Sequence, residues 1–350
     1  MKRILFTLLM LWSICFFAQI PAYYNDVNLT LTGQALKNEL AQKITVTHTN
    51  ILDYSDVWAV LQQTDLDPSN SANVLLVYGY NDSDGDIIND RTRNKNNNGG
   101  NVGEWNREHV FPKSLGQPDL GTTGPGADAH HLRSSDVQMN GNRSNRQFAS
   151  GSGNAGTSGS NWYPGDEWKG DVARMIMYMY LRYGNQCLPT NVGVGTAVVS
   201  DASMIDLFLQ WNADDTVSVY ETNRNNILET EQGNRNPFID NPYLATIIWD
   251  GPVAMDKWDM TIGIGEHENK NYFTMYPNPV TESVNIQLVN HPKNAHEHIY
   301  LYSINGQLIQ QYSATQIKNN TLEIHDLKQG VYLVKYNTLE STQTQKLIVQ

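Results

Sequence analysis

The spacing of apolar residues divides the chain into a part with helical periodicity and a later part with the alternation typical of strands. Leu36, Leu40 and Ile44 recur every fourth residue, so we expect a helix over residues 33–47. Residues 74–78 (VLLVY) are a short, β-branched apolar run that predicts a buried strand. Further helices are expected over residues 53–63, 166–183, 201–211 and 218–231.

From residue 272 onward, short segments of alternating polar and apolar residues are separated by turn-forming residues. Several short strands at regular spacing predict a small all-β sandwich. The strands are expected over residues 283–288, 298–302, 308–312, 321–324, 331–336 and 344–349.

The start of the chain has the pattern of a signal peptide. Lys2 and Arg3 precede an apolar run over residues 4–17, which is too short to cross a bilayer. No later apolar run is long enough either, so we expect an exported protein with no stable membrane span. The predicted division is residues 1–18 (signal peptide), 19–262 (first domain), 263–271 (polar linker) and 272–350 (second domain).

Residues 104–148 concentrate the side chains that could carry chemistry. Glu108 lies on a predicted strand, and a second strand leads to Asp136, a good N-cap for a helix over residues 137–148. That helix would carry Asn140 in its early turns, facing back toward Glu108. Two strands and a helix would then form a compact hairpin able to hold a metal ion.

The residue types in this segment suit phosphodiester hydrolysis. Oxygen atoms of Glu108 and Asn140 are the ligands that Mg²⁺ or Mn²⁺ prefers, since these ions bind few protein groups and keep several waters. His109, with a pKa near neutrality, could deprotonate a water that attacks phosphorus. Without context, the Glu108–His109 pair would more simply be a surface salt bridge; the cluster of Asn140, Arg143 and nearby polar residues favours a site.

Two other patterns raise the question of a metal. The alternating acids Asp82, Asp84 and Asp86 allow a Ca²⁺ site, but Gly85 is one place early for an EF-hand loop. A polar turn between strands is therefore the favoured interpretation. Adjacent histidines at positions 130 and 131 rarely chelate one ion, so His130 is expected to be structural rather than a zinc ligand.

Charge and cysteine content add less. The net charge of −12 argues against a nucleic-acid partner, because such proteins are usually basic. From Arg91 to Arg146, however, eight Lys and Arg residues outnumber five Asp and Glu residues, which permits a locally positive groove. Cys15 lies in the predicted leader and Cys187 stands alone after it, so no intrachain disulfide is expected.

Five motifs occur in order along the first part of the chain: EHVFPKS (108–114), DAHHL (128–132), NGNRSN (140–145), KGDVAR (169–174) and QGNRNPFID (232–240). Together they resemble the bacterial endonuclease I family, and the resemblance extends over roughly residues 19–250. Members of this family are secreted or periplasmic, non-specific nucleases of the ββα-metal (His-Me finger) class.

The resemblance implies an α+β fold in which helices wrap a ββα-metal core, followed here by the small sandwich. It assigns the general base to His109 and the ligands of one Mg²⁺ to Glu108 and Asn140. Family members cleave DNA, and often RNA, with little sequence preference and leave 5′-phosphate ends. Some relatives steady the phosphate with an Arg in the loop between the two halves. Residues 115–126 contain none, which leaves Arg133 or Arg143 to substitute.

The predicted β domain carries the motifs YPNPV (276–280), LYSING (301–306), LKQGVYL (327–333) and KLIV (346–349). With these motifs it resembles the sorting domain of type IX secretion in Bacteroidetes-type bacteria. That resemblance implies recognition by the secretion machinery, passage across the outer membrane, and removal or surface anchoring afterwards.

Our main hypothesis is therefore a secreted, monomeric, metal-dependent endonuclease acting on DNA and, as a second substrate, RNA. A different class of function is a non-catalytic surface adhesin that binds Ca²⁺ through residues 82–86. A third is a phosphodiesterase acting on smaller phosphate esters.

Overall fold

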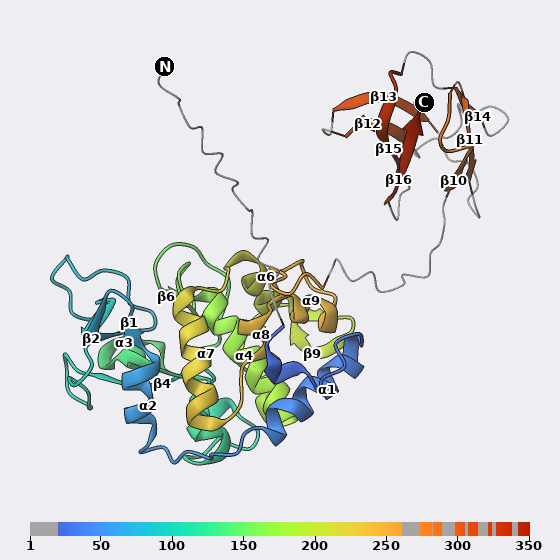
Figure 1. Cartoon of the computed structure of the whole chain (residues 1–350). Helices are drawn as coiled ribbons and strands as arrows, with labels where there is room; N and C mark the ends of the chain where they lie inside the picture. The colour runs from blue at the N-terminus through green and yellow to red at the C-terminus, as the bar shows by residue number, and fades with distance from the viewer. Residues whose placement is uncertain are drawn as a thin grey trace, which may run out of the picture. The chain divides into compact units, whose positions relative to one another are not determined.

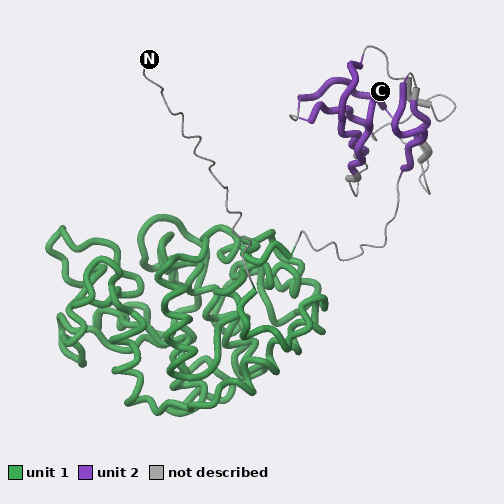
Figure 2. Tube along the Cα trace, in the orientation of Figure 1, with its two compact units in different colours: residues 1–263 green, residues 264–350 purple. Residues whose placement is uncertain are grey.

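The chain divides into residues 1–263 and residues 264–350, two units that are each described by themselves (Figure 2). The predicted signal peptide and the predicted linker, residues 263–271, lie outside the described residues. The computed structural model describes residues 20–260, 273–281, 283–288, 298–304, 307–313, 321–323, 327–337 and 342–350.

The first unit mixes helices with short strands, which confirms the expected α+β composition (Figure 1). The α-helices are α1 (Gly33–Val46), α2 (Val57–Thr64), α3 (Val137–Arg143), α4 (Lys169–Tyr183), α5 (Pro189–Val192), α6 (Asp206–Asp214), α7 (Val219–Gln232), α8 (Pro237–Asp240) and α9 (Tyr243–Trp249), with 3-10 turns η1 (Ala22–Tyr24), η2 (Lys113–Leu115), η3 (Gly124–Ala127) and η4 (Gly184–Cys187).

Its strands form small antiparallel sheets. One sheet has the order β1-β2-β3, and three further pairs are β4-β5, β6-β7 and β8-β9. The strands are β1 (Leu66–Asp67), β2 (Asn70–Leu75), β3 (Thr92–Asn94), β4 (Trp105–His109), β5 (Leu132–Asp136), β6 (Gly156–Ser158), β7 (Asn161–Tyr163), β8 (Ala197–Val198) and β9 (Asp201–Ile205).

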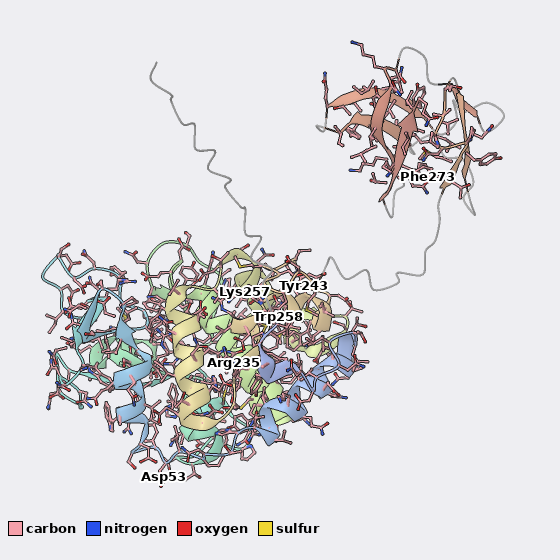
Figure 3. All side chains as sticks on the ribbon, in the orientation of Figure 1. Asp53, Arg235, Tyr243, Lys257, Trp258 and Phe273 are labelled. Carbon is pink, nitrogen blue, oxygen red and sulfur yellow. The ribbon has the colours of Figure 1, made fainter. Side chains whose placement is uncertain are left out.

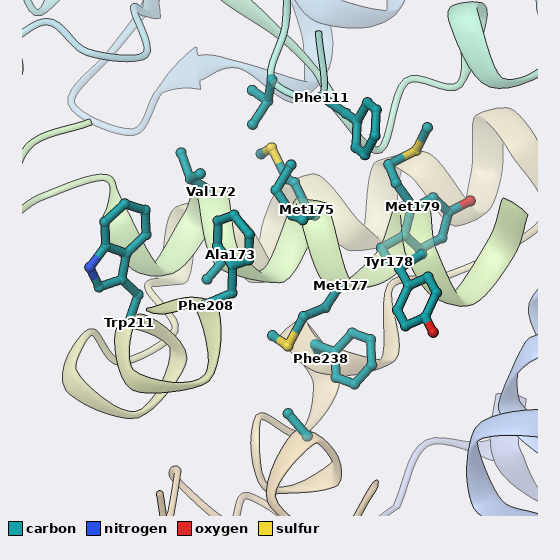
Figure 4. Close-up of a cluster of buried hydrophobic side chains, with 14 of the residues drawn as sticks. Phe111, Val172, Ala173, Met175, Met177, Tyr178, Met179, Phe208, Trp211 and Phe238 are labelled. Carbon is teal, nitrogen blue, oxygen red and sulfur yellow. The ribbon is translucent and has the colours of Figure 1, made fainter. Parts of the chain in front are cut away.

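Helix α4 is the centre of the apolar core. Its residues are buried almost all the way round, as expected of a helix surrounded by other elements. Figure 4 shows Met175 on the side of Phe111, while Met177 points to the opposite side, beside Phe238. Because Met is unbranched and flexible, it fills the irregular spaces between these partners.

One predicted helix is wrong in its first half. The helix expected over residues 201–211 is strand β9 followed by helix α6. Met204 and Ile205 are buried, and their apolar spacing is compatible with a helix. The chain stays extended there because β9 pairs with β8, with Ala197 opposite Ile205. Tertiary pairing thus overrides the local pattern.

The last segment of the first unit packs against its beginning. The ring centroid of Trp258 lies 4.9 Å from that of Tyr24. Arg235 forms an ion pair of 2.6 Å with Asp240, whose other carboxylate oxygen accepts a hydrogen bond from Tyr24. Figure 3 labels Arg235 and Trp258.

No helix within the described part of the chain has the length and apolar character needed to cross a membrane.

The second unit consists of two antiparallel sheets that share one apolar core, as expected of a small sandwich. Phe273 and Ile286 of the three-stranded sheet contribute to it together with Leu301, Val334 and Leu347 of the four-stranded sheet. The sheets are β10 (Phe273–Tyr276), β11 (Ser283–Leu288) and β14 (Thr321–Glu323), and then β13 (Leu308–Ser313), β12 (His298–Ser303), β15 (Gly330–Asn337) and β16 (Thr342–Val349).

Candidate functional site

Strands β4 and β5 and helix α3 form the frame of the candidate site. The strands pair antiparallel, with Glu108 opposite Arg133. Asp136 then caps α3, since its carboxylate accepts hydrogen bonds from two backbone N–H groups of the first turn at 2.7 and 2.9 Å. At the other end of α3, Arg143 donates to the carbonyls of His109 (3.0 Å) and Val110 (2.8 Å), which ties the helix to the end of β4.

The helix is shorter than predicted. It was expected over residues 137–148 but ends at Arg143. Ser144 has a φ of 53°, outside the helical region, which stops the helix there.

His109 is the last residue of β4, and a backbone carbonyl fixes its tautomer. Its Nε2 lies 2.9 Å from the carbonyl oxygen of Gly126. Because a carbonyl only accepts, Nε2 carries the hydrogen and Nδ1 keeps a free lone pair. Burial lowers the pKa of His109 to about 3, with a further contribution from neighbouring His131. The ring is therefore a neutral base at neutral pH.

Gly126 can place this carbonyl only because it lacks a side chain. A Cβ added there would lie 2.1 Å from the carbonyl oxygen of Gly121, which is backbone and cannot easily move. Within the loop from β4 to β5, Gly126 therefore packs closely against Gly121 while its carbonyl contacts His109.

Glu108 points to the other face of β4. Its Oε1 accepts a hydrogen bond from the Tyr78 hydroxyl at 3.0 Å and lies 3.1 Å from Nη1 of Arg143. Burial raises the pKa of Glu108 to about 7, outweighing the effects of Arg143 and Tyr78. A cation bound at this carboxylate would favour its charged form and lower that pKa.

Asn140 approaches the same face of β4 as Glu108. Its Nδ2 donates to Oδ1 of Asn106 at 2.7 Å, and Asn106 lies two residues before Glu108, on the same side of the strand. The amide oxygen of Asn140 has no hydrogen-bond partner among the described residues. Glu108 and Asn140 thus supply a carboxylate and an amide oxygen, a donor set that fits Mg²⁺ or Mn²⁺.

The structure places both predicted phosphate-binding arginines in the interior, contrary to expectation. Arg133 is fully buried, 3.5 Å from Asp65 and 3.1 Å from Asp171. Arg143 is also fully buried, and its N–H groups contact Glu108 and backbone carbonyls. A guanidinium enclosed in this way has no surface to offer a phosphate. Strand β5 is buried along its whole length, which explains the position of Arg133.

The adjacent histidines are held by backbone carbonyls. Nε2 of His131 donates to Pro125 at 2.8 Å, and Nε2 of His130 donates to Asn234 at 3.2 Å. No group of three or more His, Cys, Asp or Glu residues is arranged to hold a metal within the described ranges.

The carboxylates of the 82–86 loop accept hydrogen bonds from groups of the surrounding segment, residues 81–92. Asp82 accepts from the backbone N–H groups of Arg91 and Thr92, and Asp86 accepts from that of Ile88. Asp84 accepts from the backbone N–H of Asp86 and from two Asn side chains. These bonds are those of a polar turn.

Two residues beside His109, Tyr54 and Arg107, were not predicted from the sequence to belong to the site. Tyr54 stacks on the His109 ring, with centroids 5.3 Å apart and planes 24° from parallel. Arg107 lies on the same face of β4 as His109, two residues earlier. The alternation of a strand is a signal that could have identified Arg107. No sequence signal connects Tyr54 to this strand.

Comparison with family models gives two matches. Residues 32–243 match the model described as Endonuclease I. Residues 274–350 match the model described as Secretion system C-terminal sorting domain.

Two curated relatives match about two thirds of the chain. An extracellular ribonuclease of Bacillus subtilis (strain 168) is 43% identical over 245 residues, which is 67% of this chain and 80% of the relative. An extracellular ribonuclease of Bacillus amyloliquefaciens is 42% identical over 244 residues, covering 66% and 79%. Among solved structures, dimeric latent PorU from Porphyromonas gingivalis matches 22% of this chain and 9% of its own at 21% identity. Its TM-score of 0.16 is too low to indicate a shared fold.

Proposed function

The chain belongs to the endonuclease I family, and from this premise we propose that it is a metal-dependent endonuclease that hydrolyses phosphodiester bonds in RNA and DNA. His109 is the general base, and Glu108 and Asn140 hold one Mg²⁺, for which Mn²⁺ can substitute. The observation that carries the proposal is the tautomer of His109, whose Nε2 faces a carbonyl and whose Nδ1 is left to accept a proton.

The protein is an exported nuclease, secreted or held at the cell surface, because it combines a sorting domain with extracellular nuclease relatives. We assign delivery to the type IX machinery, acting through the second unit. The arrangement of two antiparallel strands followed by a helix supports membership of the ββα-metal class.

The reaction follows from the chemistry of His109. A water molecule attacks phosphorus while its proton passes to Nδ1, and the bond from phosphorus to the 3′ oxygen breaks. The leaving 3′ oxygen takes up a proton from solvent water, so the products carry a 5′-phosphate and a 3′-hydroxyl. When bound, Mg²⁺ supplies charge stabilisation for the transition state and the leaving oxygen. Burial lowers the pKa of His109 well below the near-neutral value expected from the sequence, so Nδ1 is unprotonated at neutral pH and free to accept this proton.

Water as nucleophile supports activity on both nucleic acids, because no 2′-hydroxyl takes part in the bond change. The two Bacillus relatives are named ribonucleases, which supports RNA as one substrate. We include DNA because the chemistry at phosphorus is the same. Cleavage is expected to weaken as salt rises, since phosphate contacts release counterions.

The test is degradation of RNA, plasmid and linear DNA by the purified protein with Mg²⁺, with EDTA, and as His109→Ala. We expect the rate with His109→Ala to fall by about 10²–10⁴-fold, the contribution of a positioned general base. EDTA should abolish cleavage. His298→Ala is the matched control, because this histidine belongs to the second unit. It should cleave like the wild type.

Each outcome bears on a different part of the proposal. Full activity in His109→Ala would leave a nuclease with another base. Activity in EDTA would remove the metal from the mechanism. Absence of cleavage by the folded protein under every metal would favour the Ca²⁺-binding adhesin, and cleavage of only bis(p-nitrophenyl) phosphate would favour a phosphodiesterase of small esters.

A further inference from the structure

Arg107 shares one face of β4 with the general base. Along this strand Trp105, Arg107 and His109 alternate with Asn106 and Glu108, so the first three side chains leave on the same side. On that side, the ring of Tyr54 contacts His109 and the ring of Trp58 contacts Trp105. Both aromatic residues lie at or just before the start of α2, the helix labelled beside β4 in Figure 1.

Aromatic rings and a carbonyl hold the Arg107 guanidinium in place. Its Cζ lies 3.6 Å from the centroid of the Tyr54 ring and 4.1 Å from that of the Trp58 ring. Its Nη1 donates to the backbone carbonyl of Tyr54. Because the Tyr54 ring also stacks on His109, the cation and the base are positioned by one side chain.

The charge of Arg107 has no acidic partner among the described residues, and its buried Nε has no hydrogen-bond acceptor. Arg133 and Arg143 differ, since each lies against a buried carboxylate. Aromatic faces compensate a cation only in part. A half-buried guanidinium without an anion has been partly removed from water and is therefore prepared to bind one.

Phosphodiester hydrolysis supplies such an anion. Negative charge grows on the non-bridging oxygens as water attacks, and a fixed guanidinium binds these oxygens with two parallel N–H groups. We propose that Arg107 binds the non-bridging oxygens of the phosphate attacked at His109. This inference rests on the proposed function and names the side chain that neutralises the reacting group.

The experiment compares Arg107→Gln and Arg107→Lys with two controls. Arg91→Gln removes a charge from an arginine of the same unit that is paired with Glu167. Lys113→Gln removes the other cation whose charge reaches His109. Cleavage kinetics are measured for each variant. Binding of a fluorescein-labelled DNA duplex is measured by anisotropy across a NaCl series, in the His109→Ala background.

With Arg107→Gln we expect kcat to fall about 10–100-fold, more than KM rises, because the contact strengthens in the transition state. The slope of log Kd against log salt should decrease by about 0.9, the value for one lost phosphate contact. Arg107→Lys should recover part of both effects. Thermal unfolding should be unchanged in Arg107→Lys, and Arg91→Gln should leave kinetics and slope unchanged.

Several results would overturn the inference. One is that Arg107→Gln keeps the wild-type kcat and the wild-type slope of log Kd against log salt, while the wild-type protein cleaves. The proposed nuclease function would then stand, but the role of Arg107 would not. Another is a loss of kcat and salt slope found only in Lys113→Gln. A third is a loss in Arg91→Gln equal to that in Arg107→Gln, which would indicate general attraction between a positive protein surface and the nucleic acid. If Arg107→Gln does not fold, Arg107→Lys decides, because a wild-type kcat there contradicts paired N–H contacts. If the wild-type protein does not cleave and the His109→Ala protein does not bind the duplex, both proposals fall together.

Discussion

The β4–β5 hairpin carries arginines in two opposite settings. On β5, Arg133 lies in the interior between the carboxylates of Asp65 and Asp171. On β4, Arg107 is half-buried against aromatic rings with no carboxylate beside it in the described structure. A compensated charge holds elements together, whereas an uncompensated one is available to a ligand. We therefore expect substitutions in the first setting to affect folding and those in the second to affect cleavage.

The largest effect on stability is expected at Asp65. This carboxylate pairs with both Arg133 and Arg224 and accepts a hydrogen bond from the backbone of Ser134 at 2.6 Å. Asp65→Asn should lower the free energy of unfolding by about 3–5 kcal/mol, because it leaves two buried cations undercompensated. Urea unfolding followed by circular dichroism measures it.

The control for Asp65 is Asp119→Asn. Asp119 is an exposed loop residue whose carboxylate accepts a hydrogen bond from the backbone N–H of Gly121. Its substitution should change stability by no more than about 0.5 kcal/mol. Equal losses of unfolding free energy in Asp65→Asn and Asp119→Asn would show that the buried ion pairs of Asp65 do not stabilise the fold.

A smaller effect, on cleavage alone, is expected at Tyr54. Tyr54→Ala removes the ring that contacts both Arg107 and His109, and kcat should fall about 10-fold, the equivalent of a partly desolvated cation–π contact. Tyr54→Phe keeps the ring and should retain wild-type kcat. A loss of kcat in Tyr54→Phe as large as in Tyr54→Ala would instead assign the effect to the hydroxyl.

The smallest effect concerns a partly exposed ion pair. Burial acts to raise the pKa of Asp201, but hydrogen bonds from Lys37 (2.7 Å), Ser203, Trp249 and Tyr180 leave it lowered. A lowered folded-state pKa stabilises the fold above the unfolded pKa, near 3.9, and the contribution is lost as pH falls through the folded value. Asp201→Asn should therefore be about 1 kcal/mol less stable than wild type at pH 7.

The same pair of proteins tests the pH dependence. The difference between wild type and Asp201→Asn in urea unfolding should shrink below about pH 4. A difference that stays constant down to the acid limit would show that the charge of Asp201 is not its cause.

Local sequence predicted those parts of the site that depend on neighbours along the chain. The strand that carries Glu108, the N-cap at Asp136 and the placement of Asn140 on the following helix all follow from adjacent residues. The beginning of α1 at Gly33 was predicted for the same reason. Such features are governed by hydrogen bonds within a few residues.

The fate of each arginine could not be predicted in this way. Asp65 and Asp171, which enclose Arg133, come from distant parts of the sequence, and no spacing signals their approach. Tyr54 reaches His109 across a similar separation. Burial and pairing of a charge are therefore properties of the folded chain, and the local motif alone does not assign the phosphate-binding role.

Because Gly126 has no side chain, its carbonyl can lie where it fixes the tautomer of His109. A single methyl group there would push the loop away from Gly121 and carry the carbonyl off the His109 ring. The imidazole could then exchange its tautomers, and the lone pair would spend part of its time on the wrong nitrogen. Under the proposed mechanism, a substitution at this glycine would lower the cleavage rate although His109, Glu108 and Asn140 are unchanged.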